Sequence, residues 1–221
     1  MAIDLIHLRN LMRLILAEPA METRLLRTNI REEIARATGD GEGGMDFYSP
    51  FWADAKAHVR GDRDLSAQTA IRVAASAQRR NLYPQLRDGF LDWWQERRRR
   101  RNEPFTVLEV QVRGRCPIEG VGVIRVENNL AFRIGDDGLR IIYPYFNDEP
   151  EITVDVARIG LWAMSQALPD FAIADMRILD VIRGRSFSID EAPQSGTEAA
   201  ELEAAYRLLI NRWHVLRASY P

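Results

Sequence analysis

The residues most able to do chemistry form an arginine run beside two tryptophans. The run follows Trp93 and Trp94 within one helical turn and consists of Arg97, Arg98, Arg99, Arg100 and Arg101. Arginine neutralises phosphate charge and tryptophan stacks on unpaired bases, so this combination favours contact with a nucleic acid or an acidic protein. The alternative is a solvated helix end, where the macrodipole favours cations. The sequence leaves both interpretations open.

A second group of candidates is acidic and surrounds the start of a predicted helix. Its members are Asp148, Glu149, Glu151 and Asp155. Carboxylates at this density can hold a divalent cation, whereas compensation of helix N-terminal charge is the structural alternative. The sequence therefore assigns no metal-ligand set.

Other reactive residue types are sparse. Cys116 is the only cysteine, which excludes an internal disulfide and a cysteine-rich zinc site. The histidines stand alone on predicted helices, so no paired-histidine motif is present. Among 30 basic residues only Lys56 is a lysine, so any mechanism that needs a lysine has this single candidate. We assign no catalytic residue, no metal and no cofactor.

Length and composition indicate an ordinary globular chain. It has 221 residues, of which 46% are hydrophobic and 28% are charged, and a formal net charge of −2 that identifies no partner. We expect one domain over 1–221, with a helical part at 1–104 and a sheet-containing part at 105–221. No apolar stretch is long enough to span a membrane, so we expect a cytoplasmic protein.

Helical periodicity dominates the first part of the chain. Residues 3–17 predict a helix with a broad apolar face, and residues 21–37 predict a second. Residues 47–103 predict further helices that carry the aromatic cluster. The face of the first helix is either core or a partner contact, and it is made of Leu5, Leu8, Met12 and Ile15.

The second part of the chain changes to the two-residue alternation of strands. We predict an antiparallel meander over 108–143, a buried helix over 152–168, and a hairpin after residue 176. The last helix carries an apolar seam made of Leu202, Tyr206, Leu209, Trp213 and Leu216. The predicted fold is α+β: a helical N-terminal half packed on a mostly antiparallel sheet of about five or six strands, with a C-terminal helix.

This order of elements resembles the core of RecB-like PD-(D/E)XK nucleases. The segments that correspond are the meander over 124–146, the helix over 152–168 and the strand and turn over 176–185. The resemblance implies an acidic residue on one strand and an acid-x-lysine on the next, which would hold Mg²⁺ and activate water. The strand over 140–146 has neither a carboxylate nor a lysine, and Glu109-Val-Gln111 mimics a variant of the motif on a different strand. The active-site motif is therefore missing.

Three functions follow as hypotheses. The first is a non-catalytic binding subunit or accessory protein of a larger assembly, which contacts nucleic acid or an acidic protein through the arginine run. The second is a divergent metal-dependent nuclease that uses Glu109, Glu127, Asp136 or Asp148. The third is a protein-binding accessory or chaperone-like factor, with the first helix and the C-terminal seam as contact faces. We lean against an enzyme and expect a protein partner, with nucleic acid as the other candidate.

Overall fold

The computed structural model describes residues 3–39, 47–100, 104–135 and 138–220. Its helices are α1 (Leu8–Leu16), α2 (Pro19–Ala37), α3 (Ser49–Arg60), α4 (Leu65–Ala75), α5 (Leu82–Arg100), α6 (Val154–Ala167) and α7 (Glu198–Arg217), with short 3-10 turns at Ala77–Arg79 and Ile173–Asp175. Its strands are β1 (Leu5–His7), β2 (Phe105–Val107), β3 (Gly114–Ile118), β4 (Gly122–Val126), β5 (Leu130–Ile134), β6 (Gly138–Tyr145), β7 (Met176–Asp180) and β8 (Arg185–Phe187).

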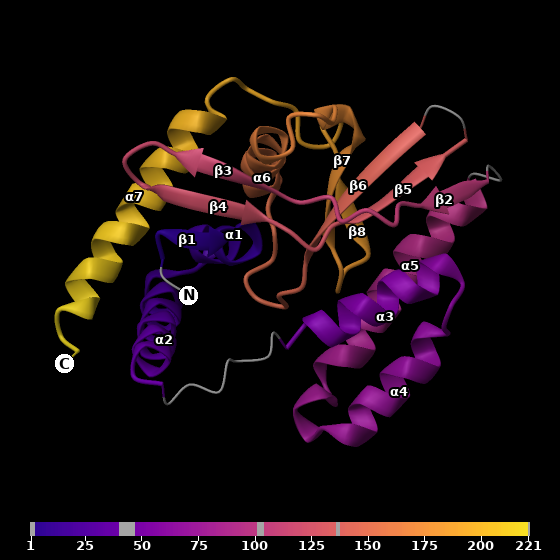
Figure 1. The fold of residues 1–221 in the computed structure, drawn as a ribbon, viewed down its shortest axis with the longest axis horizontal. Coiled ribbons are helices and arrows are strands. Elements are labelled where there is room, and N and C mark those ends of the chain that lie inside the picture. The colour runs from indigo at the N-terminus through magenta and orange to yellow at the C-terminus, as the bar shows by residue number, and fades with distance from the viewer. Residues whose placement is uncertain (1–2, 40–46, 101–103, 136–137, 221) are drawn as a thin grey trace.

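The strands form two sheets (Figure 1). The larger has the order β2-β5-β6-β7-β8, and its only parallel pair is β6 with β7, which α6 connects. The smaller has the order β1-β4-β3, with β1 parallel to β4. Because a parallel connection needs a long crossover, α6 lies across the larger sheet.

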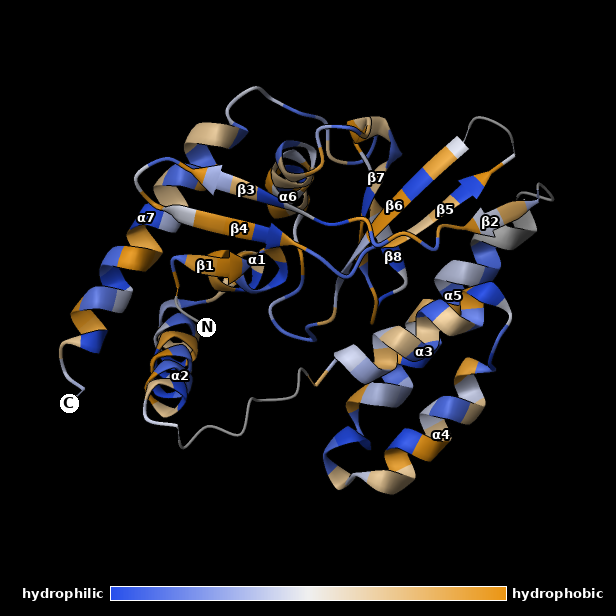
Figure 2. Cartoon of the chain, viewed as in Figure 1, coloured by the Kyte–Doolittle hydropathy of each residue, from blue (hydrophilic) through white to orange (hydrophobic). Residues whose placement is uncertain are grey.

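Both faces of the larger sheet are covered by helices. Side chains alternate between faces along a strand, so Ile141 and Tyr143 enter the core shared with α6, whereas Ile142 enters a second core beneath α3 and α5. Figure 2 shows apolar and polar residues following one another along β6 and β5. The sheet thus separates two hydrophobic cores.

The two cores differ in composition. The first is mainly aliphatic and joins α1, α2, α6, α7 and the smaller sheet. The second is rich in aromatic rings from α3 and α5. Helix α5 approaches the turn after β7 very closely, since a Cβ on Gly89 would lie 2.1 Å from the carbonyl oxygen of Ile182. A glycine is therefore needed in the middle of this helix.

The structure confirms the α+β class, the N-terminal helices and the C-terminal helix, but it divides the elements differently. The strands form two sheets, and β4 lies in a different sheet from β5 and β6, so these three do not make one meander. The N-terminal helices are also divided, because α1 and α2 join the first core and α3 to α5 join the second.

Two predicted segments were wrong. Residues 5–7 are strand β1 rather than the start of the first helix, because their extended backbone pairs in parallel with β4. Residues 108–112 are not a strand: the strands on either side are β2 and β3, and Val110 is 78% exposed. Within the described ranges, no helix is both long enough and apolar enough to cross a bilayer.

Candidate functional site

The two tryptophans beside the arginine run belong to the second core. Trp93 and Trp94 are only 3% and 6% exposed. The Trp94 ring meets those of Phe105 and Phe132 edge-on, at centroid distances of 5.1 Å and 5.8 Å. An indole packed on its neighbours in this way has no free face for a base, so these two residues are corrected from predicted stacking platforms to core residues.

The arginine run lies at the end of α5. Arg97 to Arg100 form its last turn, and α5 ends at Arg100. The side chains of these four residues, and the whole of Arg101, lie outside the described part of the structure. The run therefore stays a prediction.

The predicted apolar contact face of the first helix is largely core. Leu8 and Met12 are 0% and 1% exposed, and Met12 packs on α6 opposite Gly160. Leu5 and Ile15 are half-buried. Leu8 and Met12 are thus not accessible to a partner in this structure, because both are buried in the first core.

The C-terminal seam is core as well. Its first four members are buried, namely Leu202, Tyr206, Leu209 and Trp213. The Tyr206 hydroxyl also donates to the carbonyl of Ile3 at 2.6 Å. This inner face of α7 therefore holds the fold together rather than offering a contact face.

The carboxylates considered for a nuclease centre lie apart or are neutralised. Glu127 lies 3.9 Å from His7, Glu109 is exposed, and Asp136 falls outside the described residues. Asp148 lies 3.8 Å from Arg183. Across the residues with described positions, no three histidine, cysteine or acidic side chains gather as a metal would require.

Arg183 organises the acidic residues at the ends of β6 and β7. Its guanidinium bonds to Asp180 at 3.2 Å and lies 3.4 Å from Glu151. Asp180 is 1% exposed, and burial raises its pKa, an effect that Arg183 partly offsets. Asp148 and Glu151 therefore lie beside an arginine rather than around an open metal site, an arrangement that neither interpretation of the sequence included.

Cys116 is equally unsuited to reaction in this fold. It lies on β3 with 1% exposure, and burial raises the pKa of its thiol to about 11. A thiol with a raised pKa is protonated at neutral pH and is a poor nucleophile.

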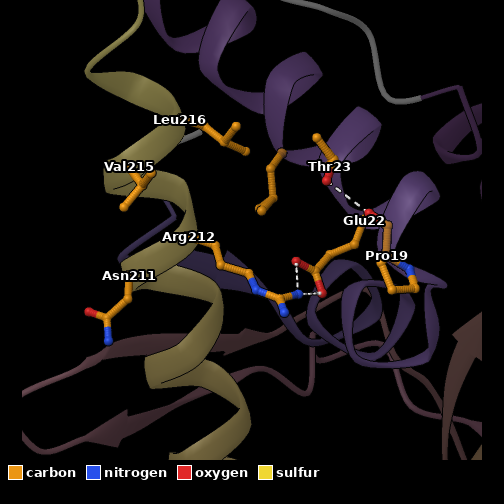
Figure 3. A pocket seen from close by; sticks show the side chains of 8 residues that line it. Pro19, Glu22, Thr23, Asn211, Arg212, Val215 and Leu216 are labelled. Atoms are coloured by element: carbon orange, nitrogen blue, oxygen red, sulfur yellow. Dashed lines mark hydrogen bonds and ion pairs between the residues drawn. The ribbon is translucent and has the colours of Figure 1, made fainter.

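The structure instead presents a groove between α2 and α7 (Figure 3). The cavity has a volume of about 420 Å³ and is lined by Pro19, Glu22, Thr23, Leu26, Asn211, Arg212, Val215 and Leu216. It lies between the N-terminal half of α2 and the C-terminal half of α7, which run side by side at the edge of the molecule (Figure 1). We call this feature the α2–α7 groove.

A polar pair and a buried indole fix the two walls of the groove. The Nη1 atom of Arg212 donates to both carboxylate oxygens of Glu22 at 2.7 Å, as the dashed lines in Figure 3 mark. Below this pair, the Trp213 indole donates to Asn29 at 3.0 Å. The helices are thus held at a set separation, and the groove is preformed.

Apolar side chains extend the groove onto the outer face of α7. Val215 lines it and is 74% exposed, and Leu208, seven residues earlier on the same face, is 52% exposed. Two helical turns separate them, so they form one stripe. Exposed aliphatic residues aligned beside a cavity are typical of a binding surface.

Helix α2, which forms the opposite wall, also carries exposed arginines that do not themselves line the groove. Arg24, Arg27 and Arg31 are exposed on α2, at spacings of three and four that place them on one face. Arg27 follows groove-lining Thr23 by one turn. Within the described ranges, none of the three arginines has a hydrogen bond or an ion pair through its side chain.

Sequence reasoning missed this groove because it followed the inner seam of α7. The spacing of Leu208 and Val215 was visible on the other face of the same helix and could have indicated a second apolar stripe. The contact between Glu22 and Arg212 joins residues 190 positions apart, and no local pattern indicates it.

No protein-family model, no curated protein and no solved structure matches this chain.

Proposed function

We propose that this protein is a non-catalytic, protein-binding accessory subunit whose α2–α7 groove takes an acidic amphipathic helix from a partner. The observation that carries the proposal is an exposed apolar stripe on α7 facing a preformed groove, with exposed arginines on α2 that have no partner among the described residues. This proposal keeps the accessory role expected from the sequence but moves the contact from the buried faces to the outer face of α7.

The apolar part of the surface supports a helical occupant. A helix that binds in a groove presents apolar anchors at positions i, i+3 or i+4, and i+7. Leu208 and Val215 are themselves seven residues apart on α7. Their separation along the helix axis is about 10 Å, which equals the spacing of anchors i and i+7 on a bound helix. Leu26 and Leu216 supply the apolar wall on either side of the cavity.

The charges around the groove support an acidic occupant. Arg212 is neutralised by Glu22, but the exposed arginines on α2 have no such partner among the described residues. Carboxylates on the solvent-facing side of a bound partner helix would face these arginines of α2. Such charges raise the association rate and disfavour basic partners.

The proposal is tested with a fluorescein-labelled helical peptide that has leucines at i, i+3, i+4 and i+7 and glutamates elsewhere. Binding is followed by fluorescence anisotropy. We expect the unmodified protein to bind it and Val215→Glu to weaken binding by about tenfold or more, because a charge would enter an apolar contact. The matched control is Val110→Glu, which changes an equally exposed valine away from the groove and leaves binding unchanged.

A second peptide separates charge from simple hydrophobicity. It has the same leucines but lysines in place of glutamates, and we expect it to bind at least about tenfold more weakly. Equal binding of the two peptides, or equal binding by Val215→Glu and the unmodified protein, contradicts the proposal. Circular dichroism of both variants checks that the fold is retained.

A further inference from the structure

A second, smaller cavity is lined by residues of α1 and α3, two of which are cationic. Its volume is about 60 Å³, and it is lined by Arg9, Ser49, Trp52, Ala53, Lys56, Asn128 and Phe146. Four of these residues lie on one face of α3, at positions 49, 52, 53 and 56. The other walls come from α1, from the turn after β4 and from the end of β6. We call this feature the α1–α3 pocket.

Lys56, the only lysine of the chain, is half-buried in this pocket. In the part of the chain that the structure describes, its amine has no hydrogen bond and no ion pair. Burial and the neighbouring Arg60 lower its pKa, and no carboxylate there offsets them. A half-buried cation without an acidic partner is destabilising unless an anion joins it.

Arg9 supplies a second cation, held in place by aromatic rings. Its guanidinium carbon lies 5.2 Å from the centroid of the Tyr48 ring and 5.4 Å from that of Phe146. These two rings are stacked, 5.0 Å apart and nearly parallel. The backbone N–H of Arg9 donates to the Tyr143 hydroxyl at 2.8 Å, which fixes the start of α1. The two rings thereby place a positive charge at the wall of the pocket.

The turn that carries Asn128 is also fixed. Asn128 has a φ of 65°, in the left-handed region that asparagine tolerates better than most residues. Its carbonyl accepts a hydrogen bond from the Trp52 indole at 2.5 Å. The turn is thereby tied to α3 beside the cavity, which Asn128 lines.

We propose that the α1–α3 pocket binds a phosphate group, either as inorganic phosphate or as the phosphate end of a small organic molecule. Lys56, whose amine has no partner among the described residues, suits an anion, and lysine and serine are donors to phosphate oxygens. A cavity of about 60 Å³ is far smaller than the roughly 300 Å³ that a whole drug-sized ligand occupies, so it fits a single small group. This site is separate from the α2–α7 groove, shares no lining residue with it, and does not depend on the function proposed above.

The single lysine allows a test on the unmodified protein. An amine-acylating reagent is added in limiting amount, and modification of Lys56 is measured by peptide mass spectrometry relative to the N-terminal amine of the same chain. The additions are inorganic phosphate, glycerol phosphate and acetate, each at matched ionic strength. We expect phosphate near ten times its Kd to slow the modification of Lys56 by about tenfold, because about nine-tenths of the sites are then occupied.

The additions distinguish the sources of the phosphate. Equal protection by inorganic and glycerol phosphate supports a site for the free ion, and stronger protection by glycerol phosphate supports an organic phosphate. Protection by acetate as strong as that by phosphate overturns the proposal, as does an unchanged rate with both phosphates. All of these outcomes are measured on the unmodified protein, so none of them depends on the folding of a variant.

A matched pair of variants places the effect in the pocket. Phosphate is expected to raise the Tm of the unmodified protein and of Arg60→Gln, which removes one exposed charge from the same helix outside the pocket. In Lys56→Gln the rise is lost. A rise that persists in Lys56→Gln, or that disappears in Arg60→Gln as well, shows general charge screening and contradicts the site.

Discussion

The two ends of α7 are each attached to the rest of the molecule by an arginine–glutamate pair, in very different surroundings. At the N-terminal end Arg158 pairs with Glu198, and their side chains are 12% and 2% exposed. In the C-terminal half Arg212 pairs with Glu22, and the corresponding values are 47% and 11%. One helix therefore carries both a buried and a half-exposed ion pair.

The buried pair is surrounded by hydrogen bonds of its own. The Glu198 carboxylate also accepts from the backbone N–H groups of Ser195 and Gly196, at 2.6 Å and 3.0 Å. Arg158 reaches Ser195 and Glu201 as well. A buried pair stabilises only when its remaining donors and acceptors are satisfied in this way.

The pair at the groove is open in comparison. Arg212 makes both of its bonds to Glu22 through Nη1, and nearly half of its side chain faces solvent. The hydrogen-bonding groups of the buried pair are satisfied within the fold, whereas the C-terminal half of α7 exposes polar and apolar groups that the proposed partner helix would contact. The predictions below test that division.

The largest effect is expected on the inner face of α7, in its C-terminal half. Trp213→Ala removes a side chain that is 6% exposed and its bond to Asn29. Such truncations cost about 3–5 kcal/mol, a large share of a total stability of about 5–15 kcal/mol. Urea denaturation measures the loss.

The control for this variant is Val215→Ala on the outer face, where 74% of the residue is exposed. We expect it to change stability by no more than about 0.5 kcal/mol. If Trp213→Ala unfolds at the same urea concentration as Val215→Ala, the inner face of α7 is not core, and it does not differ from the outer face in its contribution to stability.

The next largest effect is expected at the buried pair. Arg158→Met keeps an unbranched apolar stem but removes the guanidinium, and so leaves Glu198 buried without its cation. Losing hydrogen bonds to a buried charged group costs about 1.5–3 kcal/mol. The same denaturation measurement on Arg207→Met, whose salt bridge with Glu203 is half exposed on the same helix, gives the reference. Equal losses in the two variants would contradict a special role for the buried pair.

Much of the fold was predictable because local patterns are strong in this chain. Alternation predicted β5 and β6, and helical periodicity predicted α2, α6 and the buried seam of α7. The pairing of β1 with β4 was not predictable, because it joins residues about 120 positions apart. The same holds for the division into two sheets, which depends on long-range pairing.

The candidate sites were less predictable than the fold. Trp93 and Trp94 were assigned to binding because residue type alone does not tell a stacking platform from a core aromatic. Lys56 was noted as the only lysine, but its pocket includes residues from α1 and β6 that lie far from it in sequence. The nuclease resemblance and the arginine run stay predictions.

A smaller effect is expected from pH, because protonation of Glu198 weakens the interaction that Arg158→Met removes. Hydrogen bonds from Ser195 and Arg158 outweigh burial and lower the pKa of Glu198 from 4.5 to about 2. A lowered pKa in the folded state means that this stabilisation is complete above pH 4.5 and is lost as pH falls toward 2.

The difference in Tm between the unmodified protein and Glu198→Gln, followed across this pH range, measures that contribution. We expect the difference to be greatest above pH 4.5 and to shrink on acidification. A difference that is constant over the range would show that Glu198 has an ordinary pKa in the folded protein.

The smallest effect is expected at the groove, where a double-mutant cycle on Glu22 and Arg212 measures the coupling between them. Each residue is changed to glutamine alone and then together with its partner, and stability is measured by denaturation at low and high salt. Pairs with one solvent-exposed member contribute about 0.2–1 kcal/mol, and salt weakens them further. The same cycle on Glu198 and Arg158 should give a larger coupling that salt changes less, because both side chains are shielded from solvent. A coupling at the groove above about 2 kcal/mol would exceed that range. The pair of Glu22 and Arg212 would then be a second structural contact of α7, and a partner helix would have to break this pair in order to bind.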